Sequence, residues 1–276
     1  MILKKKKKLK TVEVQEDALL CDEMHFDAKE AYKLLRTNVI YSLPDKKCRK
    51  VGITSATVGE GKSTVAVNLA YTLSATKSKV LLIELDLRLP TIAKKLNMKY
   101  EYGLSDYLAG KTSDKNVIYH TGKHQWDIIF SGTIPPTPTE LISSEKFINF
   151  VKKMEKVYEY IIFDLPPVNI VSDALVAKEV LDGYVLVARE NYSDKHSLRE
   201  CAEKLDFLSI PILGYVLVES SAKPTYYRKK RYGKYGKYSK YGKYRNHYYG
   251  KYGHYYSQYE NSHPEHQSKE VINHND

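Results

Sequence analysis

Short apolar runs alternate with mixed apolar and polar stretches along residues 23–222. Val80–Leu85 and Tyr160–Phe163 are largely apolar, which is typical of strands buried on both faces of a parallel sheet. The other expected strands are Arg49–Ser55, Asp127–Phe130, Gly183–Ala188 and Ile212–Val218. Helices are expected at residues 23–41, at Lys62–Ser74, near Ser144–Lys156 and near Ser193–Leu208. Strands that alternate with helices predict an α/β fold, a doubly wound and mostly parallel sheet with helices on both faces.

The size and composition suit one large domain or two small ones. The chain has 276 residues, of which 42% are hydrophobic, and this excludes a wholly disordered protein. No apolar run approaches the roughly 18 residues that a membrane span needs, and no apolar segment follows the first lysines, so neither a span nor a signal peptide is expected. Cys21, Cys48 and Cys201 are far apart and odd in number, which favours a reducing cytoplasm over a disulfide framework.

The net charge of +11 resides in the two ends of the chain. Residues 1–10 hold six lysines and residues 223–259 hold 11 basic groups, both without an acid, whereas residues 11–222 are slightly acidic. Thirteen of the 25 tyrosines lie between Tyr226 and Tyr259, mostly as Tyr-Gly-Lys, and a period of three fits neither a strand nor an amphipathic helix. Three parts are therefore expected: a basic arm at 1–22, a globular domain at 23–222 and a disordered, low-complexity tail at 223–276.

A glycine-rich loop joins the first expected strand to the second expected helix. Ala56–Ser63 has the P-loop pattern, with Ala in place of the first Gly. Glycines let backbone N–H groups turn towards a phosphate, and the helix N-terminus adds a positive dipole end. Lys62 would reach the β- and γ-phosphates of a nucleotide, and Ser63 would bind Mg²⁺. The alternative, a glycine turn before an ordinary helix, explains less of the pattern. The expected nucleotide-binding residues are Thr57, Val58, Gly59, Glu60, Gly61, Lys62, Ser63 and Thr64.

Two acidic strand ends support a site for a magnesium nucleotide. Asp164 follows an apolar strand, at the end where parallel sheets bind ligands, and could hold Mg²⁺ directly or through water. Glu84 and Asp86 follow another strand and share one side of it, because side chains alternate by two. Arg88 would lie on that side too if the chain stays extended. Taken singly, each acidic end could be a solvated turn.

These motifs resemble those of the bacterial tyrosine kinases, P-loop enzymes of capsule and exopolysaccharide systems. The similarity covers residues 23–220 and its segments keep the family's order. The matching segments are Glu30–Asn38, Ile53–Thr64, Asn68–Ala70, Glu84–Pro90, Gly132–Leu141 and Phe163–Pro167. The chain departs from the family pattern at four positions. It has Lys33 for Arg, Val58 for Pro, Glu84 for Asp and Leu165 for Ser or Thr.

The resemblance implies an ATP-dependent protein-tyrosine kinase that uses Mg²⁺. Lys62 would stabilise the transferring phosphoryl group, while Ser63, Asp164 and Glu84 would hold the metal and its waters. Asp86 is the candidate that orients or deprotonates the tyrosine hydroxyl, and Glu84 could exchange roles with it. Arg88 would bind phosphate, stabilise the loop or form a structural salt bridge. The implied phosphoacceptors lie in the tail: Tyr232, Tyr235, Tyr238, Tyr241, Tyr244, Tyr248, Tyr249, Tyr252, Tyr255, Tyr256 and Tyr259.

The resemblance also implies partners. Glu30, Lys33 and Arg36, spaced by three on one expected helix, would join copies of the chain into a ring that phosphorylates in trans. A separate transmembrane activator would recruit the cytoplasmic chain to the inner face of the plasma membrane, and a cognate tyrosine phosphatase would reverse the reaction. Lys4–Lys8 is either a solvated start or a contact to anionic lipid, worth about 1 kcal/mol per residue.

Two functions of other classes remain open. Interleaved Tyr, Lys and Gly can stack on bases and neutralise phosphates, so the chain could be a nucleotide switch whose tail binds nucleic acid or membrane. It could also be a scaffold with an inactive P-loop. Chromosome-partitioning ATPases share the deviant P-loop but carry a signature lysine where this chain has Thr57. Phosphotyrosine that disappears in Lys62→Met would distinguish the kinase from these alternatives.

Overall fold

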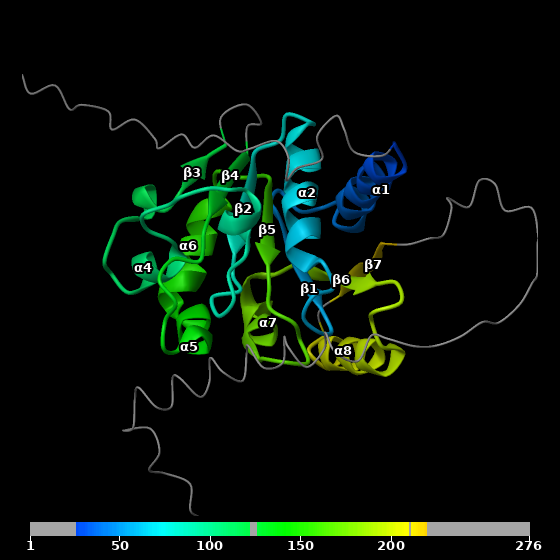
Figure 1. Ribbon diagram of the computed structural model, residues 1–276. Coiled ribbons are helices and arrows are strands. Elements are labelled where there is room, and N and C mark those ends of the chain that lie inside the picture. Colours follow the sequence, from blue (N-terminus) through cyan, green and yellow to red (C-terminus); the bar gives the residue numbers. More distant parts are fainter. Residues whose placement is uncertain (1–25, 122–125, 210, 220–276) are drawn as a thin grey trace, which may run out of the picture. The chain divides into compact units, whose positions relative to one another are not determined.

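A computed structural model describes residues 26–121, 126–209 and 211–219 (Figure 1). The basic arm, residues 122–125 and residues 220–276 with all the tail tyrosines lie outside the described residues. The expected boundaries of the arm and the tail therefore stay predictions. In the part that is described, no helix is both long and apolar enough to cross a membrane.

The described strands form a seven-stranded sheet with the order β3-β4-β2-β5-β1-β6-β7. Its strands are β1 (Arg49–Ser55), β2 (Val80–Glu84), β3 (Tyr119–His120), β4 (Trp126–Ile129), β5 (Tyr160–Asp164), β6 (Gly183–Arg189) and β7 (Ile212–Val218). All neighbours pair in parallel except β3 and β4. The connection from β1 to β2 leads towards the β3 edge of the sheet, whereas the connection from β5 to β6 leads towards the β7 edge. The carboxyl ends of the adjacent strands β1 and β5 therefore flank a topological switch point, where open α/β sheets bind ligands.

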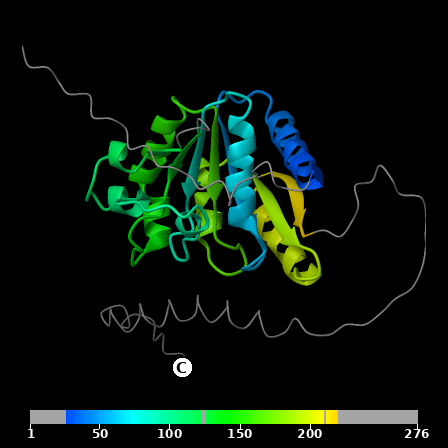
Figure 2. The ribbon, with the colours of Figure 1, turned by 45° about the horizontal axis from the view of Figure 1, so that its top comes forward.

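Helices cover both faces of this sheet. The helices are α1 (Phe26–Ser42), α2 (Lys62–Ser74), α3 (Ile92–Lys95), α4 (Leu104–Leu108), α5 (Pro138–Ser143), α6 (Glu145–Met154), α7 (Asp173–Val176) and α8 (Lys195–Phe207). Figure 2 shows α2 and α1 side by side on one face of the sheet. The hydrophobic cluster on that face includes residues of α1, α2 and α3, and the cluster on the other includes residues of α4 to α8.

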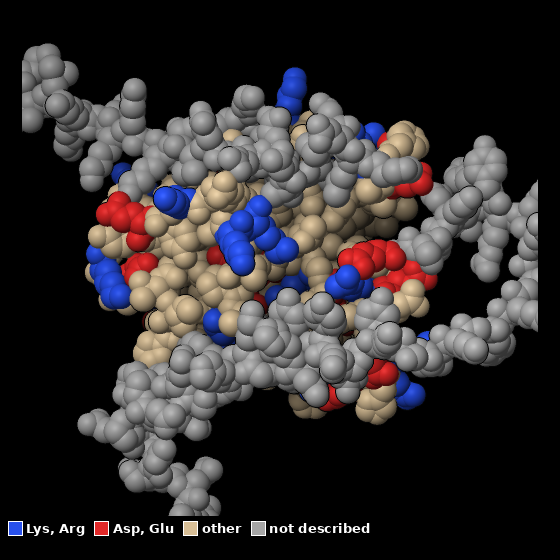
Figure 3. Space-filling view, in the orientation of Figure 1, with Lys and Arg blue, Asp and Glu red and all other residues tan. Residues whose placement is uncertain are grey.

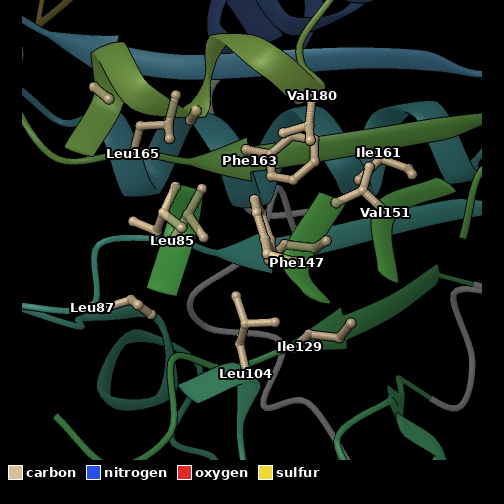
Figure 4. Packing of buried hydrophobic residues seen from close by; sticks show 14 of the residues in the cluster. Leu85, Leu87, Leu104, Ile129, Phe147, Val151, Ile161, Phe163, Leu165 and Val180 are labelled. Carbon is tan, nitrogen blue, oxygen red and sulfur yellow. The ribbon is translucent and has the colours of Figure 1, made fainter. Parts of the chain in front are cut away.

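Alternating side chains of the central strands divide between these two cores. Leu81 and Ile83 point to the α6 side, while Val80 and Leu82 point to the α2 side, and all four are fully buried. Figure 4 shows how Phe163 packs beside Phe147 of α6 in the core on the α6 side of the sheet. Because both faces are apolar, the central strands carry the continuous hydrophobic runs from which they were predicted.

The predicted doubly wound α/β fold is confirmed, and every expected strand is present within about two residues. Trp126, the first residue of β4, is buried. The strand β3 and the helices α3, α4, α5 and α7 were not predicted from the sequence. Each of these helices has six residues or fewer, so none completes two turns of a 3.6-residue period. Short elements of this kind are positioned by tertiary packing.

The backbone at Gly103, the residue before α4, passes very close to the backbone at Gly132, which follows β4. A Cβ atom built on Gly103 would lie 2.2 Å from the backbone nitrogen of Gly132 and 2.5 Å from the carbonyl oxygen of Phe130. We expect Gly103→Ala to lower the free energy of unfolding by about 3 kcal/mol, because the clash involves backbone atoms that cannot rotate away. Urea denaturation measures this loss. Gly214→Ala is the matched control, since a Cβ there meets no atom within 4 Å, and equal midpoints for the two variants would contradict the expectation.

Candidate active site

The loop between β1 and α2 has the backbone that a phosphate cradle requires. Gly59 and Gly61 have φ angles of 80° and 93°, in the left-handed region that favours glycine. Lys62 begins α2, whose 13 residues direct the N-terminal end of the helix dipole at this loop. Positive φ angles at two glycines and a helix N-terminus directly after them are the backbone features of a phosphate-binding loop.

Side chains from inside the loop and from the segment after β6 brace it. Glu60 is buried, and its carboxylate accepts hydrogen bonds from the Thr57 backbone N–H (2.8 Å) and from the Ser193 hydroxyl. Burial raises the pKa of Glu60. The Tyr192 hydroxyl donates to the Val58 carbonyl oxygen at 3.0 Å. Glu60 thus stabilises the loop through its side chain, and only its backbone remains for a ligand.

The ammonium group of Lys62 lies among the predicted acidic residues. Its Nζ atom donates to Oδ2 of Asp86 at 3.1 Å, and Oδ1 of Asp86 accepts from the Leu89 backbone N–H at 3.1 Å. Burial alone would lower the pKa of Lys62, but the carboxylates of Asp86, Asp164 and Glu84 outweigh it and raise the pKa. Lys62 is therefore charged at neutral pH and ready to bind an anion.

Asp164 has a buried carboxylate near Lys62 and Ser63. The residue is 1% exposed at the end of β5, and neither carboxylate oxygen has a hydrogen bond of normal geometry among the described residues. Burial raises the pKa of Asp164 to about 6, against the opposing influence of Lys62 and the nearby Ser63 hydroxyl. A buried oxygen pair without donors is costly, so this site is suited to a cation.

Glu84 differs from Asp164 on the adjacent strand because both of its carboxylate oxygens accept hydrogen bonds. Oε1 accepts from the backbone N–H groups of Thr91 (2.6 Å) and Ile92 (2.7 Å), and Oε2 accepts from that of Ser131 (3.2 Å). Burial, together with the Asp164 carboxylate, nevertheless raises the pKa of Glu84 to about 7. Glu84 was expected to hold the metal and its waters. The geometry shows it anchoring the segment that runs from β2 to α3.

Arg88 pairs with a buried carboxylate of α7. Its guanidinium forms a bidentate ion pair with Asp173 through Nε (2.7 Å) and Nη2 (3.0 Å), and Nη2 also donates to the Thr139 hydroxyl at 3.0 Å. Of the roles expected for Arg88, this geometry supports the structural salt bridge. Asp173 was not predicted from the sequence as a site residue. Thr139 belongs to the segment Gly132–Leu141, which resembles the family but had no predicted role.

The remaining predicted residues lie elsewhere. Leu165, where the family has a hydroxyl, is fully buried in the hydrophobic core (Figure 4). In α1, Lys33 pairs with Glu30 at 2.6 Å, and Arg36 donates to the carbonyl oxygen of Thr72 in α2 at 3.0 Å. The role of these three residues in assembly stays a prediction.

The residues of this site fit a magnesium nucleotide. The turns at Gly59 and Gly61 and the N-terminus of α2 match a phosphate chain, and Lys62 supplies the cation. The orphaned oxygens of Asp164 and the hydroxyl of Ser63 are the hard donors that Mg²⁺ prefers. Bound Mg²⁺ would neutralise charge on the phosphates.

Comparisons with known proteins support a nucleotide-binding site in this chain. Residues 48–195 match the family described as "AAA domain". Tyrosine-protein kinase YwqD of Bacillus subtilis (strain 168) is 36% identical over 188 residues, which cover 68% of this chain and 79% of that protein. The chain belongs to the bacterial tyrosine kinase family. As a member, it is a tyrosine-protein kinase with a P-loop nucleotide site.

Solved structures of kinase domains share this fold. The kinase domain of Escherichia coli tyrosine kinase ETK matches with a TM-score of 0.65 and 31% identity, over 72% of this chain and 80% of that one. The chimerical protein CapA2B2 matches with a TM-score of 0.69 and 30% identity, over 76% of this chain and 92% of that one.

Proposed function

We propose that this kinase transfers the γ-phosphoryl group of ATP to the tyrosines of its own C-terminal segment, in trans between copies, and thereby regulates capsule or exopolysaccharide synthesis or export. The observation that carries the proposal is the Lys62–Asp86 pair, which lies beside the unpartnered Asp164 at the end of the P-loop. A cation for the phosphates, a carboxylate for the acceptor and a carboxylate for the metal are the parts that phosphoryl transfer requires.

The reaction uses these groups in a simple order. Lys62 and the loop N–H groups bind the phosphates of ATP, and Lys62 then shares its charge between the phosphates and Asp86. Asp86 accepts the proton of the tyrosine hydroxyl while the tyrosine oxygen bonds to the γ-phosphorus and the bond to the β-phosphate oxygen breaks. ADP and phosphotyrosine are the products. A free tyrosine has a pKa near 10, so a carboxylate within reach of the hydroxyl assists the late proton transfer.

The acceptor segment changes its charge in this reaction. Residues 223–259 carry 11 basic groups and no acid. Each phosphate adds about −1.5 to −2 charges, so about seven phosphates cancel or reverse the charge of this segment. The visible part of the described surface in Figure 3 carries acidic side chains interspersed with basic ones. A basic segment can rest on such acidic groups or on anionic lipid, and a phosphorylated one is repelled, so the reaction would act as a switch for disassembly of the ring.

The proposed assembly follows from the family resemblance. Copies would associate through Glu30, Lys33 and Arg36 of α1, a transmembrane activator would recruit the chain to the inner face of the membrane, and a tyrosine phosphatase would reset it. Lys4–Lys8 would add a contact to anionic lipid.

Mixing two variants tests autophosphorylation in trans. The first variant keeps the kinase site but has phenylalanine at the 11 proposed acceptors, Tyr232 to Tyr259. The second is Lys62→Met with an intact tail. Mass spectrometry after incubation with Mg²⁺ and ATP, with and without the activator's cytoplasmic segment, is expected to find phosphotyrosine in the second chain only when the first is present.

Two outcomes would contradict the proposal. Phosphotyrosine only within single wild-type chains, independent of concentration, would exclude the trans reaction. If no phosphotyrosine forms under any condition, the nucleotide-switch alternative is favoured. It predicts that the tail binds nucleic acid or anionic vesicles, with affinity that falls steeply as salt rises.

A further inference from the structure

We propose that Asp173, together with Thr139, is a positioning residue for the kinase reaction: it holds Arg88 and thereby fixes the loop that carries Asp86. This inference rests on the proposed function, in which Asp86 accepts the tyrosine proton. It gives a role to the segment Gly132–Leu141, which the sequence analysis singled out without one.

The loop between β2 and α3 depends on side chains for its shape. Residues 85–91 belong to no helix or strand. At the start of the loop, the N–H groups of Leu85 and Asp86 donate to the Asp164 carbonyl oxygen at 2.8 and 3.1 Å. At the end of the loop, the N–H group of Thr91 donates to Glu84. Arg88 lies between these two anchors, two residues after Asp86.

The Arg88 clamp supplies the anchor in the middle. Asp173, the first residue of α7, is 0% exposed and meets Arg88 through both carboxylate oxygens, at 2.7 and 3.0 Å. Thr139 of α5 closes a triangle, because its hydroxyl donates to Asp173 at 2.5 Å and accepts from Arg88 at 3.0 Å. Three groups from three parts of the chain are thus fixed relative to one another by four hydrogen bonds.

A planar, bidentate pair of this kind restricts direction as well as distance. It orients Arg88 towards α7, and the backbone of residue 88 is therefore held on that side. Asp86 in turn receives the Lys62 ammonium and the Leu89 N–H on its two oxygens. Without the clamp, the buried side chains of Leu85 and Leu87 still hold the loop against the core. The clamp therefore sets the finer position of residues 86–88, and a misplacement of about 1 Å at a reacting group can lower a rate by about 10²-fold.

A buried ion pair is weak support for stability as such, because desolvation of its charges opposes their attraction. A suitable control for the Arg88–Asp173 pair is therefore an ion pair that contacts no catalytic residue. Asp182 has a side chain that is only 5% exposed; it accepts from the Lys50 N–H at 2.8 Å and pairs with Lys46 and Lys50. It directly precedes β6 and therefore lies at the amino ends of the parallel strands, whereas the P-loop follows the carboxyl end of β1. Asp182→Asn therefore matches Asp173→Asn in chemistry, and nearly in the burial of the carboxylate, but not in location.

The experiment compares these two variants in the full chain. We expect Asp173→Asn to lower kcat for tyrosine phosphorylation by about 10–100-fold, while the Kd for ADP changes less than about twofold because the P-loop is untouched. Asp182→Asn is expected to lower the melting temperature without lowering kcat. Thr139→Ser keeps the hydroxyl and should retain most of kcat, whereas Thr139→Val should lose it in part.

Hydrogen exchange of the nucleotide-free protein provides a readout that needs no activity. In Asp173→Asn the amides of residues 85–91 should exchange faster, and those of α2 should not. If kcat and the exchange of residues 85–91 both match wild type, the positioning role is overturned. If the wild type forms no phosphotyrosine but the loop still exchanges faster in the variant, the proposed function has failed and the clamp stands.

Discussion

Replacing Lys62 with methionine is expected to lower the rate of tyrosine phosphorylation by about 10²–10³-fold or more. The substitution keeps an unbranched apolar side chain of nearly the same length but removes the charge that meets the phosphates. It also removes the partner of Asp86, at 3.1 Å, and the cation that keeps the pKa of Asp164 from rising further. Phosphotyrosine formation from radiolabelled ATP, with the activator's cytoplasmic segment present, measures the loss.

Lys153→Met is the matched control for this substitution. Lys153 is an exposed lysine of α6 that pairs with Asp114, and it contacts no residue of the P-loop. Its removal should leave the rate within about twofold. Circular dichroism of both variants shows whether the fold is kept. A folded Lys62→Met chain that still phosphorylates at the wild-type rate would remove Lys62 from the mechanism.

Replacing Asp164 with asparagine is expected to abolish activity and, at the same time, to stabilise the nucleotide-free protein at neutral pH. The pKa of Asp164 is raised from 3.8 to about 6, so the native state binds more protons than the unfolded chain between these values. Stability therefore falls as the pH rises from about 4 to 6 and stays low above that. The ionised carboxylate costs the fold about 3 kcal/mol, because each pKa unit corresponds to 1.36 kcal/mol.

Thermal unfolding of the two proteins at several pH values measures this effect. At pH 8 the variant should melt about 5–10 °C above wild type, and the difference should shrink towards pH 4. Mg²⁺ with ADP should raise the melting temperature of wild type more than that of the variant, because only the carboxylate gains from the cation. A variant that melts below wild type at every pH would show that Asp164 is paired in solution.

The fold could be predicted from the sequence because its central strands are buried on both faces. Runs such as Tyr160–Phe163 have no polar face, and that pattern identifies a parallel sheet between helices. The helices α3, α4, α5 and α7 could not be predicted in this way. They have four to six residues each, and their positions follow from contacts that join distant parts of the chain.

The same distinction applies to the site. The P-loop is contiguous, so the chemistry of Gly59 to Ser63 follows from adjacent residues. The clamp is not contiguous, because Asp173 is 85 residues from Arg88 and only the tertiary fold brings them together. Likewise, the sequence showed that Glu84 and Asp86 share one side of a strand end. It could not show that three backbone N–H groups occupy Glu84 while both oxygens of Asp164 remain without donors.

The unpartnered carboxylate of Asp164 also bears on how long a molecule survives in a cell. Because ligand binding removes an electrostatic penalty, molecules with an empty site unfold more often than molecules that hold a magnesium nucleotide. Proteases cleave chains in their opened state, so turnover would fall mainly on molecules without ligand. The abundance of the protein would then follow the supply of nucleotide, and a chain that binds none would be degraded first.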